Sequence, residues 1–224
     1  MQTPAEVFLI EQAIIFLRNL KISPAKIINI GAGKSFVIED SIAAGGVDFK
    51  ADRTDVYECN MDNPRAGQRF ICSADKMPGV PTSEYELGFS NYVLEHVANL
   101  PDAAKEIYRV IKPGGIFATS TPNPQAPEFF ISRHTPLFFH QFIKGKGKFA
   151  EAYETFYAYK DIDELIKIFA AAGFKVKTVK FYPFTIGYLF RFPIVSILSR
   201  LYDKFVGLLG VKALMGQVGI VFEK

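Results

Sequence analysis

The stretch KIINIGAGKSFVIED, residues 26–40, decides the fold class, because an apolar run in it ends in glycines and a helix-like segment follows. The run IINI has the length and the β-branched content of a buried strand. The next segment, SFVIEDSIAAGG, has Ser35 as a candidate N-cap and stops at Gly45 and Gly46, which is typical of a helix. A strand, a glycine turn and a helix in this order predict the first unit of an α/β sheet.

The tripeptide GKS in this stretch also ends the phosphate-binding loop of P-loop NTPases, G-x-x-x-x-G-K-[ST]. Counting back from Gly33, the first glycine of that motif would fall on Ile28, inside the predicted strand. The dinucleotide fingerprint G-x-G-x-x-G fails as well, because Phe36 stands at its third glycine. Gly31 and Gly33 therefore predict a glycine turn without a phosphate cradle.

The rest of the chain alternates segments of strand and helix character, which predicts an open parallel sheet with helices on both faces. Predicted strands are 26–32, 47–56, 69–75, a segment beginning at 85, 116–124, 175–183 and 217–224. Predicted helices are 35–46, 101–115 and 161–174. Residues 1–22 predict an amphipathic N-terminal helix whose apolar face is formed by Val7, Ile10, Ile14 and Leu17, and not a signal peptide.

The composition of the 224 residues suits one α/β domain, 1–224, and excludes a disordered chain, because 49% of the residues are hydrophobic. A net charge of +3 is too small to argue for nucleic acid as a partner. Cys59 and Cys72 have neither zinc-site nor CxxC spacing, so no metal site is expected. Two unpatterned thiols predict a reducing, cytoplasmic location, with a single disulfide as the alternative.

Acidic residues follow two further predicted strands. Asp52 and Asp55 end the second one, about twenty residues after the glycine turn, where a carboxylate binds ribose hydroxyls. Asp55 is preferred, and one of the two is expected to be a surface acid paired with Arg53. Asp75 follows the third strand. Acids without a phosphate cradle suit a nucleoside that lacks phosphates, such as S-adenosylmethionine, at the carboxyl ends of the strands.

Five segments in this order resemble the class I S-adenosylmethionine-dependent methyltransferases, particularly the type 11 group. They are IINIGAG (27–33), SADKMP (73–78), FSNYVLEHV (89–97), AAKEIYRVIKPGGIFATSTPNP (103–124) and DIDELIKIFAAAGFKV (161–176). The resemblance covers the chain from residue 26 to residue 182. It implies a doubly wound, seven-stranded, mostly parallel Rossmann-like sheet with an antiparallel last strand, and S-adenosylmethionine as the cofactor.

The resemblance also implies which residues bind the cofactor: Asn29, Gly31, Ala32, Gly33, Asp52, Asp55, Ala74, Asp75, Asn91 and Tyr92. The glycines let the backbone approach the cofactor, Asp75 accepts from the adenine amino group, and Asn91 and Tyr92 line the methionine end. The family usually has an acid where Asn29 stands and often a glycine where Ser35 stands. Asn29 still offers an amide oxygen to the methionine amino group, but no charge.

Two histidines are the candidate catalytic residues. His96, in VLEHV, can take a proton near neutral pH, and a packed or capping histidine is the equal alternative. His134 lies after the fifth strand, where this family builds acceptor pockets, and a surface position is its alternative. Methyl transfer depends mainly on aligning nucleophile, methyl and sulfur, and needs a general base only if the acceptor loses its proton early.

Residues 184–216, between the last two predicted strands, form a hydrophobic insertion with Leu198, Leu201, Phe205 and Leu208 at helical spacing. Its apolar runs are too short for a membrane span, which needs about 20 residues. Core or dimer packing, a helical lid over the active site, and an interfacial helix on anionic lipid are the three alternatives.

The expected function is methyl transfer from S-adenosylmethionine to a small-molecule, glycan or lipid-linked acceptor, as O- or N-methylation, in the cytoplasm or at the membrane periphery. Nucleic acid is not expected, because NYVL (91–94) stands where amine-methylating nucleic-acid enzymes have an Asp/Asn-Pro-Pro-aromatic motif. The alternative is a catalytically silent relative that acts as a partner subunit through 184–216. An NAD-dependent oxidoreductase is the third hypothesis.

Overall fold

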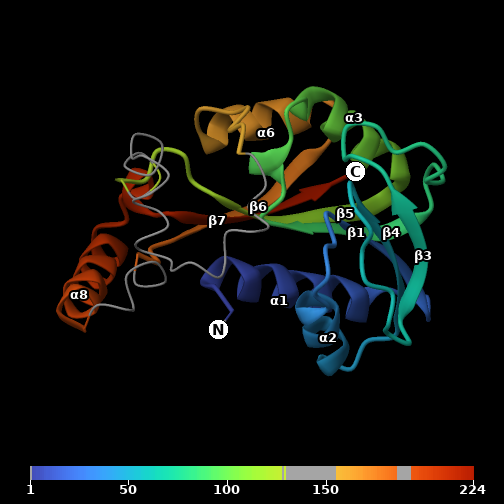
Figure 1. The fold of residues 1–224 in the computed structure, drawn as a ribbon, viewed down its shortest axis with the longest axis horizontal. Helices are drawn as coiled ribbons and strands as arrows, with labels where there is room; N and C mark the ends of the chain where they lie inside the picture. Colours follow the sequence, from blue (N-terminus) through green and yellow to red (C-terminus); the bar gives the residue numbers. More distant parts are fainter. Residues whose placement is uncertain (1, 128, 130–154, 186–192) are drawn as a thin grey trace.

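The computed structural model describes the chain except residues 1, 128, 130–154 and 186–192, and gives only the backbone of 193–196. One seven-stranded sheet forms the centre, in the order β3-β2-β1-β4-β5-β7-β6 (Figure 1). Its strands are β1 Ala25–Ile30, β2 Phe49–Asp55, β3 Ala66–Ile71, β4 Tyr85–Asn91, β5 Ile111–Pro122, β6 Lys175–Tyr182 and β7 Gln217–Glu223. Only β7 is antiparallel to its neighbours. The predicted seven-stranded, mostly parallel sheet is confirmed.

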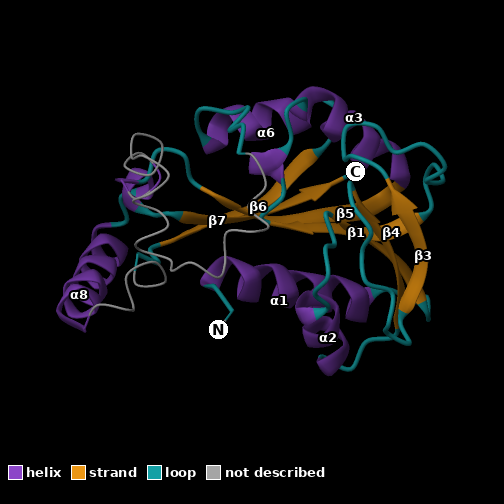
Figure 2. Cartoon of the chain, viewed as in Figure 1, coloured by secondary structure: helices purple, strands orange, loops and turns teal. Residues whose placement is uncertain are grey.

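Helices cover both faces of this sheet, as Figure 2 shows, with α1 and α2 on one face and α3 and α6 on the other. The fifth described α-helix, α8, lies at the end of the molecule, beyond β6 and β7. The α-helices are α1 Pro4–Asn19, α2 Val37–Ala44, α3 Leu100–Val110, α6 Ile162–Ala171 and α8 Pro193–Leu209, and the short 3₁₀ turns are η1 Leu94–His96 and η2 Lys212–Leu214.

Two apolar clusters, one on each face, hold these layers together. On the α3 and α6 face, Phe117, Phe169 and Phe222 stack on one another, with 4.5 Å between the ring centroids of Phe169 and Phe222. On the other face, Phe8 and Leu9 of α1 pack in the same cluster as Phe89 of β4. Because both faces are covered, β4 is buried along almost all of its length, including its polar residues Glu86 and Ser90.

The N-terminal helix forms as predicted, but its buried face was predicted only in part. Val7 is 40% exposed, whereas Phe8 and Leu9 are buried together with the predicted Ile10. Phe8 lies over Gly219 of β7, where a Cβ atom would come within 2.2 Å of its ring. The missing side chain at Gly219 makes the space for Phe8, which helical spacing alone does not reveal.

Two details at the glycine turn also differ from the prediction. The N-cap of α2 is Phe36 rather than Ser35, and Ser35 Oγ accepts a hydrogen bond from the Val37 amide at 3.2 Å. Both cysteines are free thiols, so the disulfide alternative is wrong. Burial raises the pKa of the Cys72 thiol to about 11, which makes it a poor nucleophile near neutral pH.

The hydrophobic insertion contains α8, whose apolar stripe does not pack into the core. Leu198, Leu201 and Phe205 are each at least 60% exposed, and Leu208 is 78% exposed. Core packing is therefore wrong for these four side chains. Within the part of the chain that the structure describes, no helix combines the length and the apolar character that crossing a bilayer requires.

Candidate functional site

A cavity of about 620 Å³ lies at the carboxyl ends of β1, β2 and β4. Eight of the predicted site residues line it: Gly31, Gly33, Asp55, Ala74, Asp75, Asn91, Tyr92 and His96. A second cavity of about 480 Å³ is lined by Asn29 and Ala32 and shares the glycine turn and Asn91 with the first. Ten of the twelve predicted residues thus surround two cavities that meet at the glycine turn.

The glycine turn has a backbone path that side chains would obstruct. Gly31 has a φ of +71°, and a Cβ atom there would lie 2.4 Å from a methyl group of Val93, which lines the larger cavity. The amides of Gly31 and Ala32 both donate to the Thr54 carbonyl at 2.9 Å, which ties the turn to the end of β2. The first glycine is therefore required by close approach as well as by its positive φ.

The structure separates the two acids of β2. Asp55 lines the larger cavity, where its Oδ2 accepts from the Gly33 amide at 2.9 Å and its Oδ1 from the Tyr57 amide at 3.1 Å. Asp52 lines neither cavity, and its carboxylate accepts from the Gln68 amide and the Tyr85 hydroxyl instead. Asp55 therefore ties the glycine turn to β2 and places a carboxylate at the cavity wall.

Arg53 is not paired with either of these acids, so the predicted surface pair is wrong. Its side chain is fully buried, and its Nη1 lies 2.9 Å from Oε1 of Glu39 in α2 as an ion pair. The other end of the guanidinium, Nη2, donates to the carbonyls of Ala32 at 2.9 Å and Ser35 at 2.7 Å. Arg53 thus holds the carbonyl side of the glycine turn from inside the domain.

Glu39 completes this buried group by accepting from Nδ2 of Asn29 at 2.7 Å. Burial raises the pKa of Glu39, and the hydrogen bond from Asn29 and the charge of Arg53 oppose that rise. A carboxylate from α2 therefore lies beside position 29, where the family usually has an acid. Sequence reasoning did not single out Glu39, because no motif marks an acid at this position of a helix.

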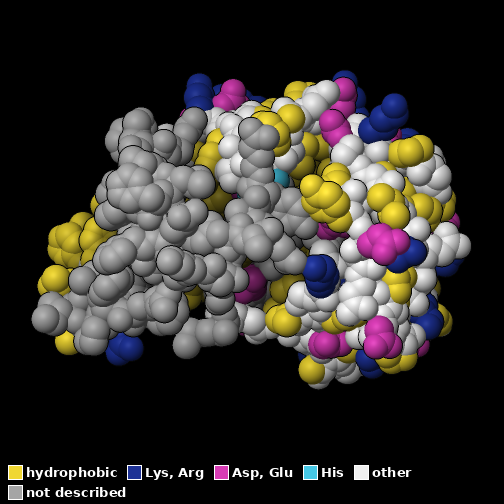
Figure 3. Space-filling view, in the orientation of Figure 1, with side chains coloured by type: hydrophobic (Ala, Val, Ile, Leu, Met, Phe, Trp, Pro, Cys, Tyr) yellow, Lys and Arg dark blue, Asp and Glu magenta, His cyan; other side chains and the backbone are white. Residues whose placement is uncertain are grey.

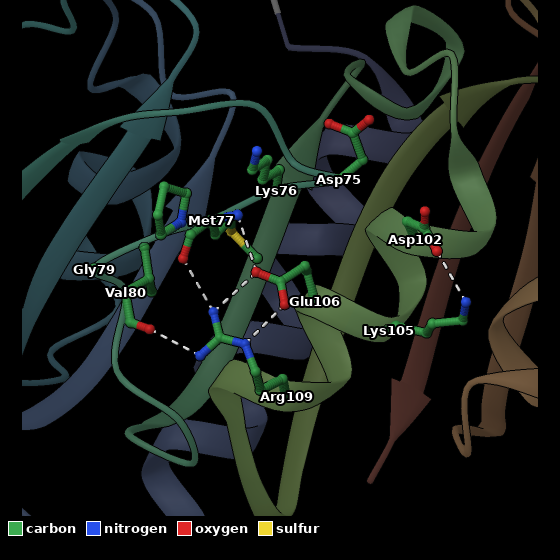
Figure 4. A pocket seen from close by; sticks show the side chains of 10 residues that line it. Asp75, Lys76, Met77, Gly79, Val80, Asp102, Lys105, Glu106 and Arg109 are labelled. Carbon is green, nitrogen blue, oxygen red and sulfur yellow. Dashed lines mark hydrogen bonds and ion pairs between the residues drawn. The ribbon is translucent and has the colours of Figure 1, made fainter.

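The loop that carries Ala74 and Asp75 is held by a clamp from α3, shown in Figure 4. Arg109 donates from Nη2 to the Met77 carbonyl at 3.1 Å and from Nη1 to the Val80 carbonyl at 2.9 Å. Glu106 accepts from the Met77 amide at 2.9 Å and from Arg109, and the hydrogen bond from Arg109 lowers its pKa. The clamp fixes the loop that carries Ala74 and Asp75 to α3.

The N-terminal helix reaches the site through its first turn. Thr3 and Glu6 form a capping box, and Glu6 Oε1 also accepts from Asn91 Nδ2 at 2.8 Å. The Thr3 hydroxyl lies 2.9 Å from the hydroxyl of Tyr92, whose φ is +54°. Glu6 lines the smaller cavity and was missed, although the sequence TPAE at residues 3–6 is a recognisable capping-box pattern.

The candidate catalytic residue His96 lines the larger cavity from η1, and its Nδ1 lies 3.5 Å from the Thr155 hydroxyl. The residue before it, Glu95, is buried and turns toward Thr121, whose hydroxyl lies 3.5 Å from Oε2. Burial raises the pKa of Glu95 to about 8. His134 lies outside the residues that the structure describes.

Glu95 predicts a dependence of stability on pH. Its pKa is about 8 in the folded protein against 4.5 ordinarily, so the folded state binds this proton more tightly than the unfolded chain. The resulting stabilisation is fully present below the unfolded pKa and is lost as the pH rises through about 8. Between pH 5 and pH 9 we therefore expect Tm of the wild-type protein to fall relative to Tm of Glu95→Gln. If Tm depends on pH in the same way in both proteins, Glu95 is not a buried, protonated residue.

Comparisons with known proteins point to a methyltransferase domain. Residues 28–119 match the family model described as "Methyltransferase domain". The demethylmenaquinone methyltransferase of Staphylococcus carnosus is 28% identical over 142 residues, which are 60% of this chain and 58% of that enzyme. The chain thus matches little more than half of the length of that curated relative.

Solved structures resemble the fold over almost the whole chain. An S-adenosylmethionine-dependent methyltransferase from Mesorhizobium loti has a TM-score of 0.61 at 14% identity and covers 98% of both chains. The geranyl diphosphate C-methyltransferase from Streptomyces coelicolor A3(2), in complex with Mg²⁺, geranyl diphosphate and S-adenosyl-L-homocysteine, has a TM-score of 0.60 at 15% identity. The match covers 95% of this chain and 78% of the Streptomyces chain.

Proposed function

Since the chain carries a class I S-adenosylmethionine-dependent methyltransferase domain, we propose that it transfers a methyl group from this cofactor to a small-molecule acceptor. The observation that carries the proposal is the larger cavity, where Gly31, Asp55, Asp75 and Asn91 converge from four segments far apart in the sequence. Such a cavity at the carboxyl ends of the strands is where open α/β sheets bind nucleosides.

The residues present fit this cofactor. Asp55 offers a carboxylate to ribose hydroxyls, and the loop at Ala74 and Asp75 offers backbone and carboxylate groups to adenine. The absent side chain at Gly31 lets Val93, which also lines the cavity, pack directly against the glycine turn. When bound, S-adenosylmethionine supplies a methyl group activated by its sulfonium. The work of this chain is then to hold the acceptor in line and to exclude water.

Glu6 takes part in this proposal as the carboxylate for the cationic methionine end. Asn29 offers no charge there and already donates to Glu39. Glu6, held by Asn91, lines the smaller cavity next to the glycine turn. We expect Glu6→Gln to weaken S-adenosylmethionine binding by about tenfold, the equivalent of one charge-assisted hydrogen bond. Glu11→Gln, farther along α1, is the matched control, and equal affinity of both variants would remove Glu6 from the site.

The acceptor class follows from the relatives only in outline. Their names include demethylmenaquinone and geranyl diphosphate. We propose an acceptor of similar size, free or lipid-linked, methylated on oxygen or nitrogen rather than on carbon as in the geranyl diphosphate enzyme. His96 would then be the base where a proton must leave. For His96→Gln we expect unchanged S-adenosylmethionine affinity and a lower turnover of such an acceptor. Equal turnover would leave His96 as a packed residue.

Calorimetric titration of the purified protein tests the proposal as a whole. We expect saturable binding of S-adenosylmethionine and S-adenosylhomocysteine, and no binding of NAD or ATP. Binding of NAD alone would favour an oxidoreductase. Binding of the adenosyl compounds without turnover across a broad acceptor screen would favour the silent partner subunit. Absence of binding of all four would overturn the assignment of the cavity.

A further inference from the structure

Among residues 197–209 of α8, whose side chains the structure describes, a narrow stripe is buried against the protein. Ser199 and Val206 are buried, and Tyr202 and Asp203 are half-buried. The six large apolar side chains on its outer surface are 54–78% exposed: Ile197, Leu198, Leu201, Phe205, Leu208 and Leu209. Figure 3 shows hydrophobic side chains at the end of the molecule where α8 lies in Figure 1. A contiguous exposed apolar surface of this kind marks a site of interaction with a partner or a membrane.

The exposed side chains are arranged in sectors. At about 100° per residue, the six apolar side chains fall within about 120° of the helix circumference. Arg200 and Lys204, both exposed, follow directly at one edge of this sector, while Ser199 and Val206 face the protein. An exposed apolar sector bordered by cations is the pattern of a helix that lies in a membrane interface, where the cations reach the lipid headgroups.

The charge of this helix has one sign on the outside. Asp203 is the single acid between residues 193 and 216, and its Oδ1 accepts from the Thr185 amide at 2.9 Å on the inner side. Arg200, Lys204 and Lys212 are all exposed. Lys212 continues the basic surface just beyond the helix, where its Nζ lies 5.3 Å from the ring centroid of Phe181. The exposed charges are therefore complementary to anions.

We propose that α8 docks the protein on an anionic membrane surface, with its apolar sector at the level of the acyl chains and Arg200 and Lys204 at the headgroups. A second copy of the chain is the less suitable occupant. Pairing two such faces would bring these cations together, with no exposed acid on either helix to offset their repulsion. An anionic lipid surface provides both the apolar environment and the opposite charge.

The topology gives this docking an orientation. β6 and β5 are both antiparallel to β7, so β6 runs parallel to β5 and ends at the edge of the sheet that carries the larger cavity. The amide of Thr185, three residues beyond the end of β6, donates to Asp203 of α8, so the helix lies near this edge. The docking itself does not depend on methyl transfer, and its test uses no activity.

Cosedimentation of the full chain with vesicles tests the proposal. We expect binding to phosphatidylcholine vesicles that contain phosphatidylglycerol, and much weaker binding to phosphatidylcholine alone or at high salt. Leu201→Ser/Phe205→Ser should lower the partition coefficient by at least about tenfold per side chain. Arg200→Gln/Lys204→Gln should lower it roughly fivefold per cation on the anionic vesicles only.

The matched control is Lys105→Gln/Lys167→Gln, which removes two exposed charges from α3 and α6. It should bind vesicles as the wild type does, and circular dichroism checks that every variant is folded. No binding to anionic vesicles, or equal loss in the control, would overturn the proposal. So would a lipid-free dimer, seen in sedimentation velocity, that Leu201→Ser/Phe205→Ser dissociates.

Discussion

Replacing Arg53 with methionine is expected to lower the free energy of unfolding by about 3–5 kcal/mol, because it leaves Glu39 buried without its counter-charge. The side chains of the two residues are 0% and 2% exposed, so water cannot take over the lost interactions. The same substitution removes the hydrogen bonds to the Ala32 and Ser35 carbonyls. For a chain of this length we expect Tm to fall by roughly 10 °C.

Chemical denaturation of matched variants measures this effect. Arg69→Met is the control, because Arg69 is exposed and lies 3.8 Å from an exposed Glu58, a pair that should contribute less than about 1 kcal/mol. Adding Glu39→Gln to Arg53→Met should restore part of the stability by removing the buried charge. If Arg53→Met lowers the free energy of unfolding no more than Arg69→Met does, the buried pair does not stabilise the fold. The double variant also serves if Arg53→Met alone fails to fold.

Replacing Asp55 with asparagine is expected to weaken S-adenosylmethionine binding by about 10- to 100-fold. The reason is that charged hydrogen-bond partners contribute about 1.5–3 kcal/mol. The carboxylate is the acid that ends β2 and lines the larger cavity. It also accepts from the Gly33 amide, so the substitution loosens the glycine turn that forms the neighbouring wall.

Asp52→Asn is the control for Asp55→Asn, since it changes the same chemical group three residues earlier on the same strand. Asp52 contacts Gln68 and Tyr85 and lines neither cavity, so cofactor affinity should stay unchanged while stability falls. Titration calorimetry at equal protein concentration compares the two variants. A larger loss of affinity in Asp52→Asn would transfer the ribose role to Asp52.

The sequence predicted the parts of the fold that depend on local patterns. The β-branched run before Gly31 and the helix at 162–171 are found near their predicted positions. The predicted helix 101–115 ends already at Val110, and its Pro-Gly-Gly residues lie inside β5 rather than at the helix end. The cavity residues at strand ends were predicted for the same reason, because carboxyl ends of parallel strands share one edge.

What the sequence did not predict are contacts between residues distant in the chain. The glycine at 219 that receives Phe8 and the acid at 39 that pairs with Arg53 carry no local pattern that names their partner. The apolar stripe of α8 shows a different limit. Helical spacing correctly placed four leucine and phenylalanine side chains on one face. Spacing alone does not say whether that face is buried in the protein or exposed.

The buried group of Asn29, Glu39 and Arg53 has an evolutionary consequence. Glu39 contacts both Asn29 and Arg53. A substitution at one of the three positions therefore removes a partner of another, and a compensating substitution becomes favourable. A homologue with an acid at position 29 would bring two carboxylates together and would favour loss of Glu39. We therefore expect these three positions to vary as a unit among homologues, with one negative charge moving between strand and helix while the arginine stays.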